Sequence, residues 1–330
     1  MIHEQLMVFK KPSYPINNQF LEYLERFDRV SKVSIYYDDL LRFSGAINVY
    51  DKNNVDTPWI RVYYSEFDRA EIDLNLKKIY SYLHSDGNTD VIKFLNVDAI
   101  DYCTFGNSKP FRVKIRNILN DNYTYFYVKK ADASRVYGLE LEHILSPDKI
   151  HFLVYKDTLI EEHIMGIPGD VFMETLLINC SEVEKSQIAK EFVKFNERCM
   201  IRLLGDMRAY NYVIVPIHDF DQVVYKIRPI DFDQQCYEGN LKVYRPQFFK
   251  ENYPMIQNIK NKLQDRSIEQ YKNEERSALA KRINTAENRI KILMKIMGND
   301  NISTDENLSQ LKLELYRYTN DMNFKNAKSM

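Results

Sequence analysis

Three polar residues in the second half of the chain have the types and the spacing needed to handle phosphate groups. Asp206 and Asn211 lie in LLGDMRAYNYVIV, residues 203–215, and Asp231 lies in IRPIDFDQQ, residues 227–235. In phosphoryl transfer from ATP, a carboxylate orients the attacking hydroxyl and accepts its proton, while an amide oxygen and a second carboxylate hold Mg²⁺. Such hard oxygen ligands suit Mg²⁺, and no His or Cys is required. The three residues therefore indicate ATP-dependent phosphoryl transfer.

The elements around these residues predict that two of them meet at one end of a β-hairpin. Asp206 and Asn211 lie between the end of a long amphipathic helix and a strand, and Asp231 ends the strand that follows the turn HDFDQ. Because a hairpin brings the outer ends of its strands together, Asp231 should lie close to Asn211. The alternative is structural: Asp-x₄-Asn is short enough to arise by chance, and an Asp after a helix is often a cap.

The order GDxxxxN, strand, short turn, strand and IDF resembles the catalytic core of aminoglycoside and choline phosphotransferases, and of protein kinases more widely. The resemblance implies that Asp206 is the catalytic base and that Asn211 and Asp231 are Mg²⁺ ligands. The family commonly has His before the Gly-Asp or Arg-Asp pair, whereas this chain has Leu-Gly-Asp. It also has Asp233 where protein kinases have the Gly of their DFG triplet. These departures favour the small-molecule or atypical bacterial branch of the protein-kinase-like superfamily.

A strand lysine that holds the α/β-phosphates, steadied by a glutamate on the next helix, is the further feature that the resemblance implies. The strand YFYVKK offers Lys129 and Lys130, and the helix ASRVYGLELEHIL offers Glu140 and Glu142. Lys130 shares a strand face with two apolar residues, which should be the more buried side. A register shift of one residue would select Lys129, so both lysines stay candidates. The glutamates project about 200° apart on a helix, so both of these also stay candidates.

Two loops complete the expected nucleotide site. The turn CTFGNSKPF should present backbone N–H groups to the phosphates through Gly106, Asn107 and Ser108, with Lys109 as an added cation. This turn has one glycine and neither a Walker A nor a GxGxxG pattern. The run LIEEHIMGIPGDVF resembles the hinge of small-molecule kinases, which implies that adenine lies against the backbone of residues 162–164: Glu162, His163 and Ile164.

The pattern of elements predicts an α+β protein with a bilobal protein-kinase-like fold. We expect an N-terminal α/β extension of unknown role over residues 1–95, and a small antiparallel-sheet N-lobe with one helix over residues 96–165. A mainly helical C-lobe with the catalytic hairpin should cover residues 166–330. Within the extension the sequence predicts a helix over residues 18–28, strands around Val33–Tyr37, Ala46–Tyr50 and Trp59–Tyr64, and a helix after the cap Ser65.

The overall composition and charge limit the classes of partner that we expect. The chain has 330 residues and a net charge of −1, so no global basic field points to nucleic acid or to an anionic membrane, and we expect neither as a partner. The four cysteines are scattered without metal-ligand spacing, which favours a reduced compartment. We see no signal peptide and no 18-residue apolar stretch, so the sequence predicts a soluble, cytoplasmic protein. It leaves the oligomeric state open.

The expected function is transfer of the γ-phosphate of ATP, with Mg²⁺, to a hydroxyl of an unidentified small molecule or protein. One alternative is a kinase-fold enzyme that transfers AMP, because the same metal site serves both reactions. A second alternative is a nucleotide-binding pseudokinase or partner-binding module. The unassigned N-terminal region and an apolar stripe on the C-terminal helices, both large enough to be docking surfaces, support this second alternative.

Overall fold

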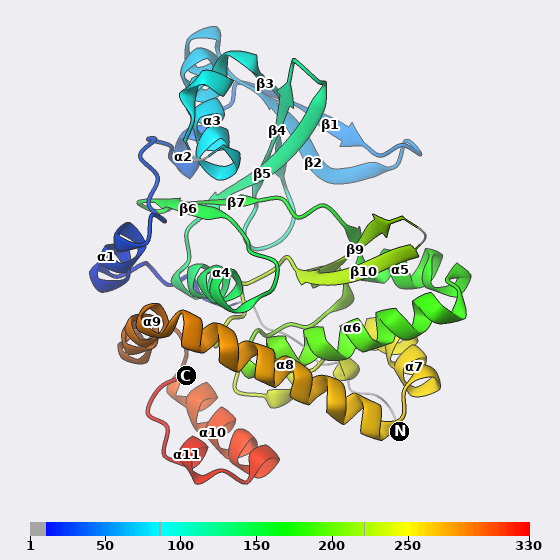
Figure 1. Cartoon of the computed structure of the whole chain (residues 1–330). Coiled ribbons are helices and arrows are strands. Elements are labelled where there is room, and N and C mark those ends of the chain that lie inside the picture. Colours follow the sequence, from blue (N-terminus) through cyan, green and yellow to red (C-terminus); the bar gives the residue numbers. More distant parts are fainter. Residues whose placement is uncertain (1–10, 86, 221) are drawn as a thin grey trace. The chain divides into compact units, whose positions relative to one another are not determined.

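The computed structural model describes residues 11–85, 87–220 and 222–330, and they form an α+β structure (Figure 1). The chain divides into two compact units. The first, here called the sheet unit, comprises Pro15–Asp132 and Ile150–His163. The second, here called the helical unit, comprises Ala133–Lys149 and Ile164–Met330, together with the segment that ends at Tyr14. The α+β class and the mainly helical C-terminal part agree with the sequence analysis.

A seven-stranded sheet with the order β1-β2-β3-β4-β5-β7-β6 forms the sheet unit, and all of its pairings are antiparallel. The bounds of these strands are Gly45–Tyr50 (β1), Asp56–Tyr63 (β2), Leu95–Cys103 (β3), Phe111–Asn117 (β4), Asn122–Lys130 (β5), Phe152–Tyr155 (β6) and Thr158–Glu162 (β7). Strand β4, FRVKIRN, alternates buried apolar and less buried polar residues, which is the pattern of a strand with one covered face, whereas β6 and β7 are buried at consecutive positions.

One face of this sheet carries the core of the unit. Val113 of β4 and Phe126 and Val128 of β5 are buried there together with Leu76 and Ile79 of α3, which lies along that face (Figure 1). Each such side chain contributes about 1.5–3 kcal/mol through its burial. The other helices of the unit are α1 (Asn18–Arg26), α2 (Tyr37–Leu40), α3 (Glu66–His84) and the 3₁₀-helix η1 (Thr89–Phe94).

Two expectations for the N-terminal region differ from the structure. The sheet unit is continuous across residue 95, where a boundary was expected, because β2 pairs with β3 and both belong to one sheet. The segment Val33–Tyr37 is not a strand, and this prediction was wrong. Its alternate residues Val33, Ile35 and Tyr37 are buried, so the segment has the period of a strand without a strand partner.

Helices dominate the helical unit, with one small three-stranded sheet of order β10-β9-β8. The strands are Ile167–Pro168 (β8), Tyr212–Asp219 (β9) and Gln222–Pro229 (β10). The α-helices are Ala133–Leu145 (α4), Gly169–Thr175 (α5), Glu182–Ile201 (α6), Tyr253–Lys262 (α7), Asp265–Thr285 (α8), Glu287–Asn299 (α9), Asp305–Thr319 (α10) and Met322–Lys325 (α11). The 3₁₀-helices are Leu177–Asn179 (η2), Ala209–Asn211 (η3), Leu241–Tyr244 (η4), Pro246–Phe248 (η5) and Lys250–Asn252 (η6).

Helix α4, expected in the N-lobe, belongs to the helical unit. Its two fully buried glutamates form ion pairs with that unit: Oε1 of Glu140 lies 2.6 Å from Nη2 of Arg289 on α9, and Glu142 pairs with Arg202 at the end of α6. A buried carboxylate needs such a partner, because the desolvation of an isolated charge is costly. The two glutamates that were candidates for the phosphate site thus also attach α4 to its neighbours.

Among the described residues, no helix combines the length and the apolar character needed to span a bilayer.

Candidate functional site

The side chain of Asn211 is bonded directly to Asp206. Its Nδ2 donates to the carboxylate Oδ2 of Asp206 at 3.0 Å and to the main-chain oxygen of the same residue at 2.8 Å. Asp206 has a φ of 54°, in the left-handed region that Asp and Asn tolerate better than other side chains do. The amide of Asn211 stabilises this uncommon backbone conformation, and because its nitrogen is used, its Oδ1 is the atom left to bind a cation.

The hairpin of β9 and β10 brings Asp231 to the same place. Tyr212 pairs with Pro229 in the ladder, and beyond it the N–H of Ile230 donates to the carbonyl of Asn211 at 3.0 Å. The expected hairpin is therefore confirmed, and Asp231 follows the residue that contacts Asn211. Its carboxylate Oδ1 accepts a hydrogen bond from the N–H of Asp233 at 3.0 Å.

A second backbone contact joins the segments that carry Asp206 and Asp231. Leu204 forms an antiparallel bridge with Gln235, and the N–H of Gly205 donates to the carbonyl of Gln234 at 3.2 Å. A Cβ at position 205 would lie 2.9 Å from that carbonyl oxygen, closer than real Cβ contacts. The close approach therefore requires glycine before Asp206, which gives the Leu-Gly-Asp sequence a structural reason.

Two charged residues that the sequence analysis missed lie beside Asp206. The guanidinium of Arg208 places its Nε 3.2 Å from Oδ1 of Asp206 and its Nη1 2.6 Å from Oε1 of Glu251. Arg208 could have been found, since it follows Asp206 by two positions in GDMR. Glu251 could not, because it lies in η6, far along the chain, with no motif around it.

Burial and charge act against each other on the Asp206 carboxyl. Burial raises its pKa above the ordinary range, while Arg208 and the amide of Asn211 lower it, and burial is the largest cause. Burial also raises the pKa of Glu238, and the negative charge of Asp206 raises it further. The two carboxylates therefore repel each other. A carboxyl with a raised pKa is a better proton acceptor at neutral pH than an ordinary aspartate is.

Asp233, which stands where protein kinases have glycine, forms an ion pair with Arg135 of α4. Ser134, the residue directly before Arg135, donates from its Oγ to the carbonyl of Gln235 at 2.6 Å. Both contacts connect the start of α4 to the segment after Asp231. Asp233 therefore has a positioning role for that segment in this structure.

The two candidate lysines differ in burial, and in the opposite sense from the one expected. Lys130 does share a face with Phe126 and Val128, but it is the last residue of β5 and its side chain is 59% exposed. The side chain of Lys129, on the other face, is 11% exposed and forms an ion pair with Glu161 of β7. The core ends before Lys130, which explains why the apolar face does not bury it.

The expected phosphate-binding turn lies between β3 and β4 in the sheet unit. Gly106 has a φ of 85° and Lys109 a φ of 37°, so the turn has two left-handed positions. Asn107 is exposed and Ser108 is half-buried, and the carbonyl of Lys109 accepts a hydrogen bond from the Tyr37 hydroxyl at 2.8 Å. The turn is thus held by α2, and its role in phosphate binding stays a prediction.

The expected hinge coincides with the passage from one unit to the other. Glu162 and His163 end the second segment of the sheet unit, and Ile164 begins the last segment of the helical unit. Nδ1 of His163 lies 3.0 Å from the hydroxyl of Tyr127, and burial, followed by the nearby charge of Arg112, lowers the pKa of His163. The ring therefore favours its neutral form.

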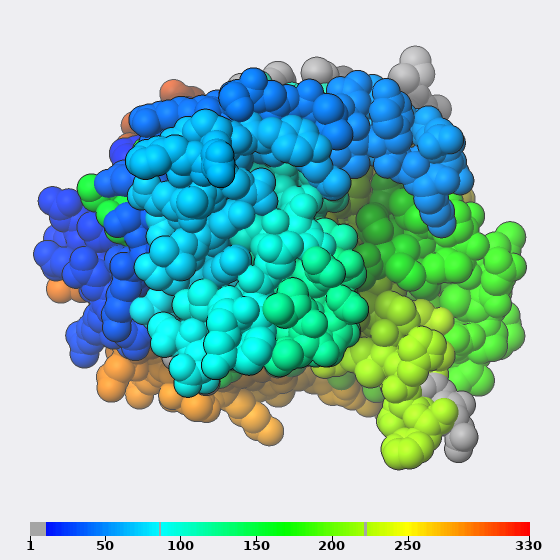
Figure 2. Space-filling view, turned by 90° about the horizontal axis from the view of Figure 1, so that it is seen from above, coloured from blue at the N-terminus to red at the C-terminus, as the bar shows by residue number. Residues whose placement is uncertain are grey.

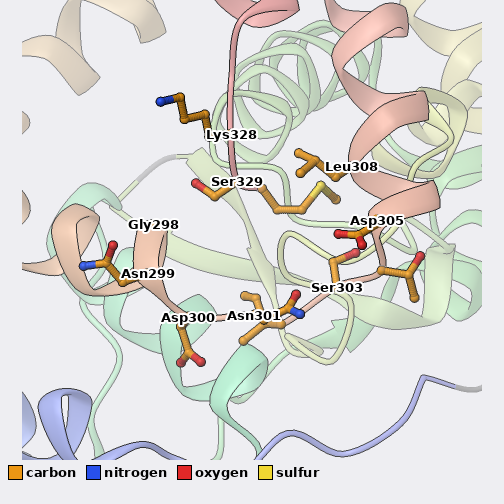
Figure 3. A pocket seen from close by; sticks show the side chains of 12 residues that line it. Gly298, Asn299, Asp300, Asn301, Ser303, Asp305, Leu308, Lys328 and Ser329 are labelled. Carbon is orange, nitrogen blue, oxygen red and sulfur yellow. The ribbon is translucent and has the colours of Figure 1, made fainter.

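Among the described residues, the proposed site included, no three or more His, Cys, Asp and Glu side chains are grouped so that they could hold a metal ion. A pocket of about 180 Å³ does lie in the helical unit, between the α9–α10 connection and the C-terminal residues (Figure 3). Asp300, which lines it, accepts a hydrogen bond from Tyr137 at 2.8 Å, so this residue has a structural partner. None of the predicted site residues lines this pocket.

A scan against models of known protein families finds none that matches the chain, and a search of curated proteins finds no match either.

Proposed function

We propose that the protein is an ATP- and Mg²⁺-dependent phosphotransferase with a bilobal protein-kinase-like fold, which transfers the γ-phosphate to a hydroxyl of a small molecule or a protein. One observation carries the proposal. Asp206 and Asn211 are joined by side-chain hydrogen bonds, and the end of the β9–β10 hairpin, which leads to Asp231, is bonded to the same Asn211. These bonds support the proposal, because they connect the segments that carry the three residue types required by phosphoryl transfer.

Asp206 is the proposed base. Its Oδ2 is occupied by the amide of Asn211, whereas its Oδ1 is buried and accepts no hydrogen bond from the described residues, although Nε of Arg208 lies 3.2 Å away. Oδ1 is therefore the atom at which an acceptor hydroxyl would donate its proton. Burial raises the pKa of Asp206, which favours proton uptake, while the charge of Arg208 lowers this pKa and so favours the ionised form.

Asn211 and Asp231 are the proposed Mg²⁺ ligands. The donor set fits this ion, because Oδ1 of Asn211 and the Asp231 carboxylate are hard oxygen ligands and the Asn211 nitrogen is turned toward Asp206. When bound, Mg²⁺ would neutralise the phosphate charge. Lys129 or Lys130, the turn Gly106–Lys109 and the backbone of residues 162–164 complete the proposed nucleotide contacts.

The test compares two variants of the full chain. Asp206→Asn should retain the thermal shift that MgATP produces while losing transfer, because it removes the base and leaves the proposed ligands. Asp231→Asn should weaken the MgATP shift itself. Absence of any MgATP shift in the parent protein contradicts the proposal. Mass analysis of the product distinguishes phosphate from AMP transfer, and nucleotide binding without turnover of any acceptor indicates a pseudokinase.

A further inference from the structure

Within the described chain, the two edge strands of the seven-stranded sheet, β6 and β1, differ in whether another segment is hydrogen-bonded to their outer side. At the β6 edge, Val154 forms a parallel bridge with Val30: its N–H donates to the carbonyl of Arg29 at 2.7 Å, and its carbonyl accepts from Ser31 at 2.8 Å. That edge is therefore capped by residues 29–31. At the other edge, β1 pairs only with β2 among the strands that the structure describes.

The register shows which backbone groups of β1 point away from the sheet. The carbonyl of Pro58 accepts a hydrogen bond from the N–H of Thr104, the residue that follows β3, so Pro58 faces the β3 side, and backbone groups alternate between the two sides along a strand. Arg61, three residues on, therefore directs its groups to β1, where its partner is Ile47. Since Ile47 faces β2, the N–H and C=O groups of Ala46 and Asn48 point outward.

β1 carries neither the charged residues nor the proline that commonly protect an edge strand, and the register of its ladder with β2 shifts only between Asn48 and Tyr50. The strand is GAINVY, with no charged residue and no proline, and five of its six positions are exposed. Ile47 and Tyr50 are 55% and 56% exposed. Natural edge strands of this length usually carry lysine, proline or a covering segment that prevents pairing with another chain. Figure 2 shows the β1–β2 hairpin, in mid-blue, along one edge of the view.

We propose that β1 pairs antiparallel with β1 of a second copy of this chain, about a two-fold axis at Ile47. In that register Ala46 lies opposite Asn48 of the second copy, so the outward N–H and C=O groups of both residues are satisfied in each copy. Ile47 lies opposite its own counterpart in a non-hydrogen-bonded pair, where side chains approach closely. The pairing joins the two sheets and leaves no open β1 edge.

A second copy is the occupant because the strand is complementary to itself. A neutral strand meets no like-charge repulsion across a two-fold axis, and it offers no charge by which a foreign strand could be selected. Two-fold symmetry is also the commonest closed arrangement of identical chains. Six residues of strand bury less than the roughly 800 Å² per partner of a standard interface, so the dimer should depend on concentration.

Disulfide trapping tests the register. Opposite Cα atoms in a non-hydrogen-bonded pair are about 4.5 Å apart, within disulfide range, so Ile47→Cys should form a covalent dimer under mild oxidation. Asn48→Cys is the matched control, because position 48 of the second copy lies diagonally, at about 7–8 Å. The parent, with its own four cysteines, sets the background. Trapping of both variants alike, or of neither, overturns the proposed pairing.

Light scattering across a concentration series provides the second measurement. The parent should rise from a mass near 39.4 kDa toward twice that value. Ile47→Lys should hold the mass at the single-chain value at every concentration, because two lysines would oppose each other across the axis. Val55→Lys, at an exposed apolar residue of the same hairpin, should dimerise like the parent. A parent that stays at the single-chain mass, or an Ile47→Lys variant that dimerises, contradicts the proposal.

Discussion

The amide of Asn211 donates to both the side chain and the main chain of Asp206, so a five-residue spacing in the sequence becomes a direct contact in the structure. The contact holds Asp206 in a left-handed conformation while leaving the oxygen of Asn211 for another partner. One residue thus connects the proposed base to the proposed metal site.

Asn211→Ala tests that connection. Loss of the two hydrogen bonds, one of them to a carboxylate, should lower the free energy of unfolding by about 1–3 kcal/mol in urea. The variant should also lose most of the MgATP thermal shift, because a proposed ligand is gone. Asn179→Ala is a suitable control, since within the described part of the chain the Asn179 side chain donates one hydrogen bond, to the carbonyl of Thr175, at an exposed site. A MgATP shift that survives in Asn211→Ala removes Asn211 from the metal site.

Gly205→Ala tests the close approach of the two segments. The added Cβ would meet the carbonyl of Gln234 at 2.9 Å, so the variant should be destabilised by about 1–3 kcal/mol in chemical unfolding. Gly298→Ala is the control, because its Cβ would meet only Ser329 Oγ at 3.6 Å inside α9, where alanine is the better helix former. If the two substitutions change the free energy of unfolding equally, the segments around Gly205 and Gln234 move apart at no energetic cost.

The raised pKa of Asp206 has a consequence for stability. A carboxyl whose pKa is higher in the folded than in the unfolded state favours folding when protonated, and this contribution is lost as pH rises through the folded pKa. At neutral pH the buried charge therefore works against the fold. Asp206→Asn should melt at a higher temperature than the parent at pH 7–8, and the difference should shrink as pH falls toward about 4. A difference that grows on acidification would mean that the charge stabilises the fold.

Arg208 should set the acid limb of the activity profile. Its guanidinium lowers the pKa of Asp206, so Arg208→Ala should move the rising limb of the rate against pH upward, since the base ionises at higher pH without the cation. Arg208→Lys, which keeps a positive charge, should move the limb less far from its position in the parent than Arg208→Ala does. Arg276→Ala, which removes an ion pair to Glu197 on α6, should leave the limb in place. If the acid limb of Arg208→Ala lies at the same pH as that of the parent, the ionisation that sets this limb does not belong to Asp206.

Elements with a strong local period were predictable, and those that depend on distant partners were not. The helix ASRVYGLELEHIL and the strand FRVKIRN have the predicted bounds, because their apolar periods and turns are unambiguous. Val33–Tyr37 has the strand period but buries its alternate residues without joining the sheet. The spacing of apolar residues indicates which side of a segment is buried. It does not indicate whether a neighbouring strand is present to pair with that segment.

The same distinction applies to the candidate site. The proximity of Asn211 and Asp231 followed from a hairpin, which is a local element. The contact of Arg208 with Glu251 joins residues far apart in sequence, and the partners of Glu140 and Glu142 lie on α9 and at the end of α6. No pattern along the chain shows such pairs, because they depend on how the helices pack.

Substitution of the two candidate lysines can decide the choice that the sequence left open. Lys129→Ala would leave Glu161, which is 4% exposed, as a buried carboxylate without its ammonium partner, at a cost of about 3–5 kcal/mol in the free energy of unfolding. Lys130→Ala removes a side chain that is 59% exposed and should change that energy by about 0.5 kcal/mol or less.

MgATP binding by the lysine variants must be measured separately from their different free energies of unfolding. Lys129→Ala together with Glu161→Gln removes the buried charge and should recover much of the stability, so MgATP binding can be measured on a folded protein. If Lys129 is the phosphate anchor, the double variant is folded and loses the MgATP thermal shift, while Lys130→Ala keeps it. If Lys130 is the anchor, the stable Lys130→Ala variant loses the shift and the double variant keeps it. A shift retained by both variants rules out either lysine as the anchor.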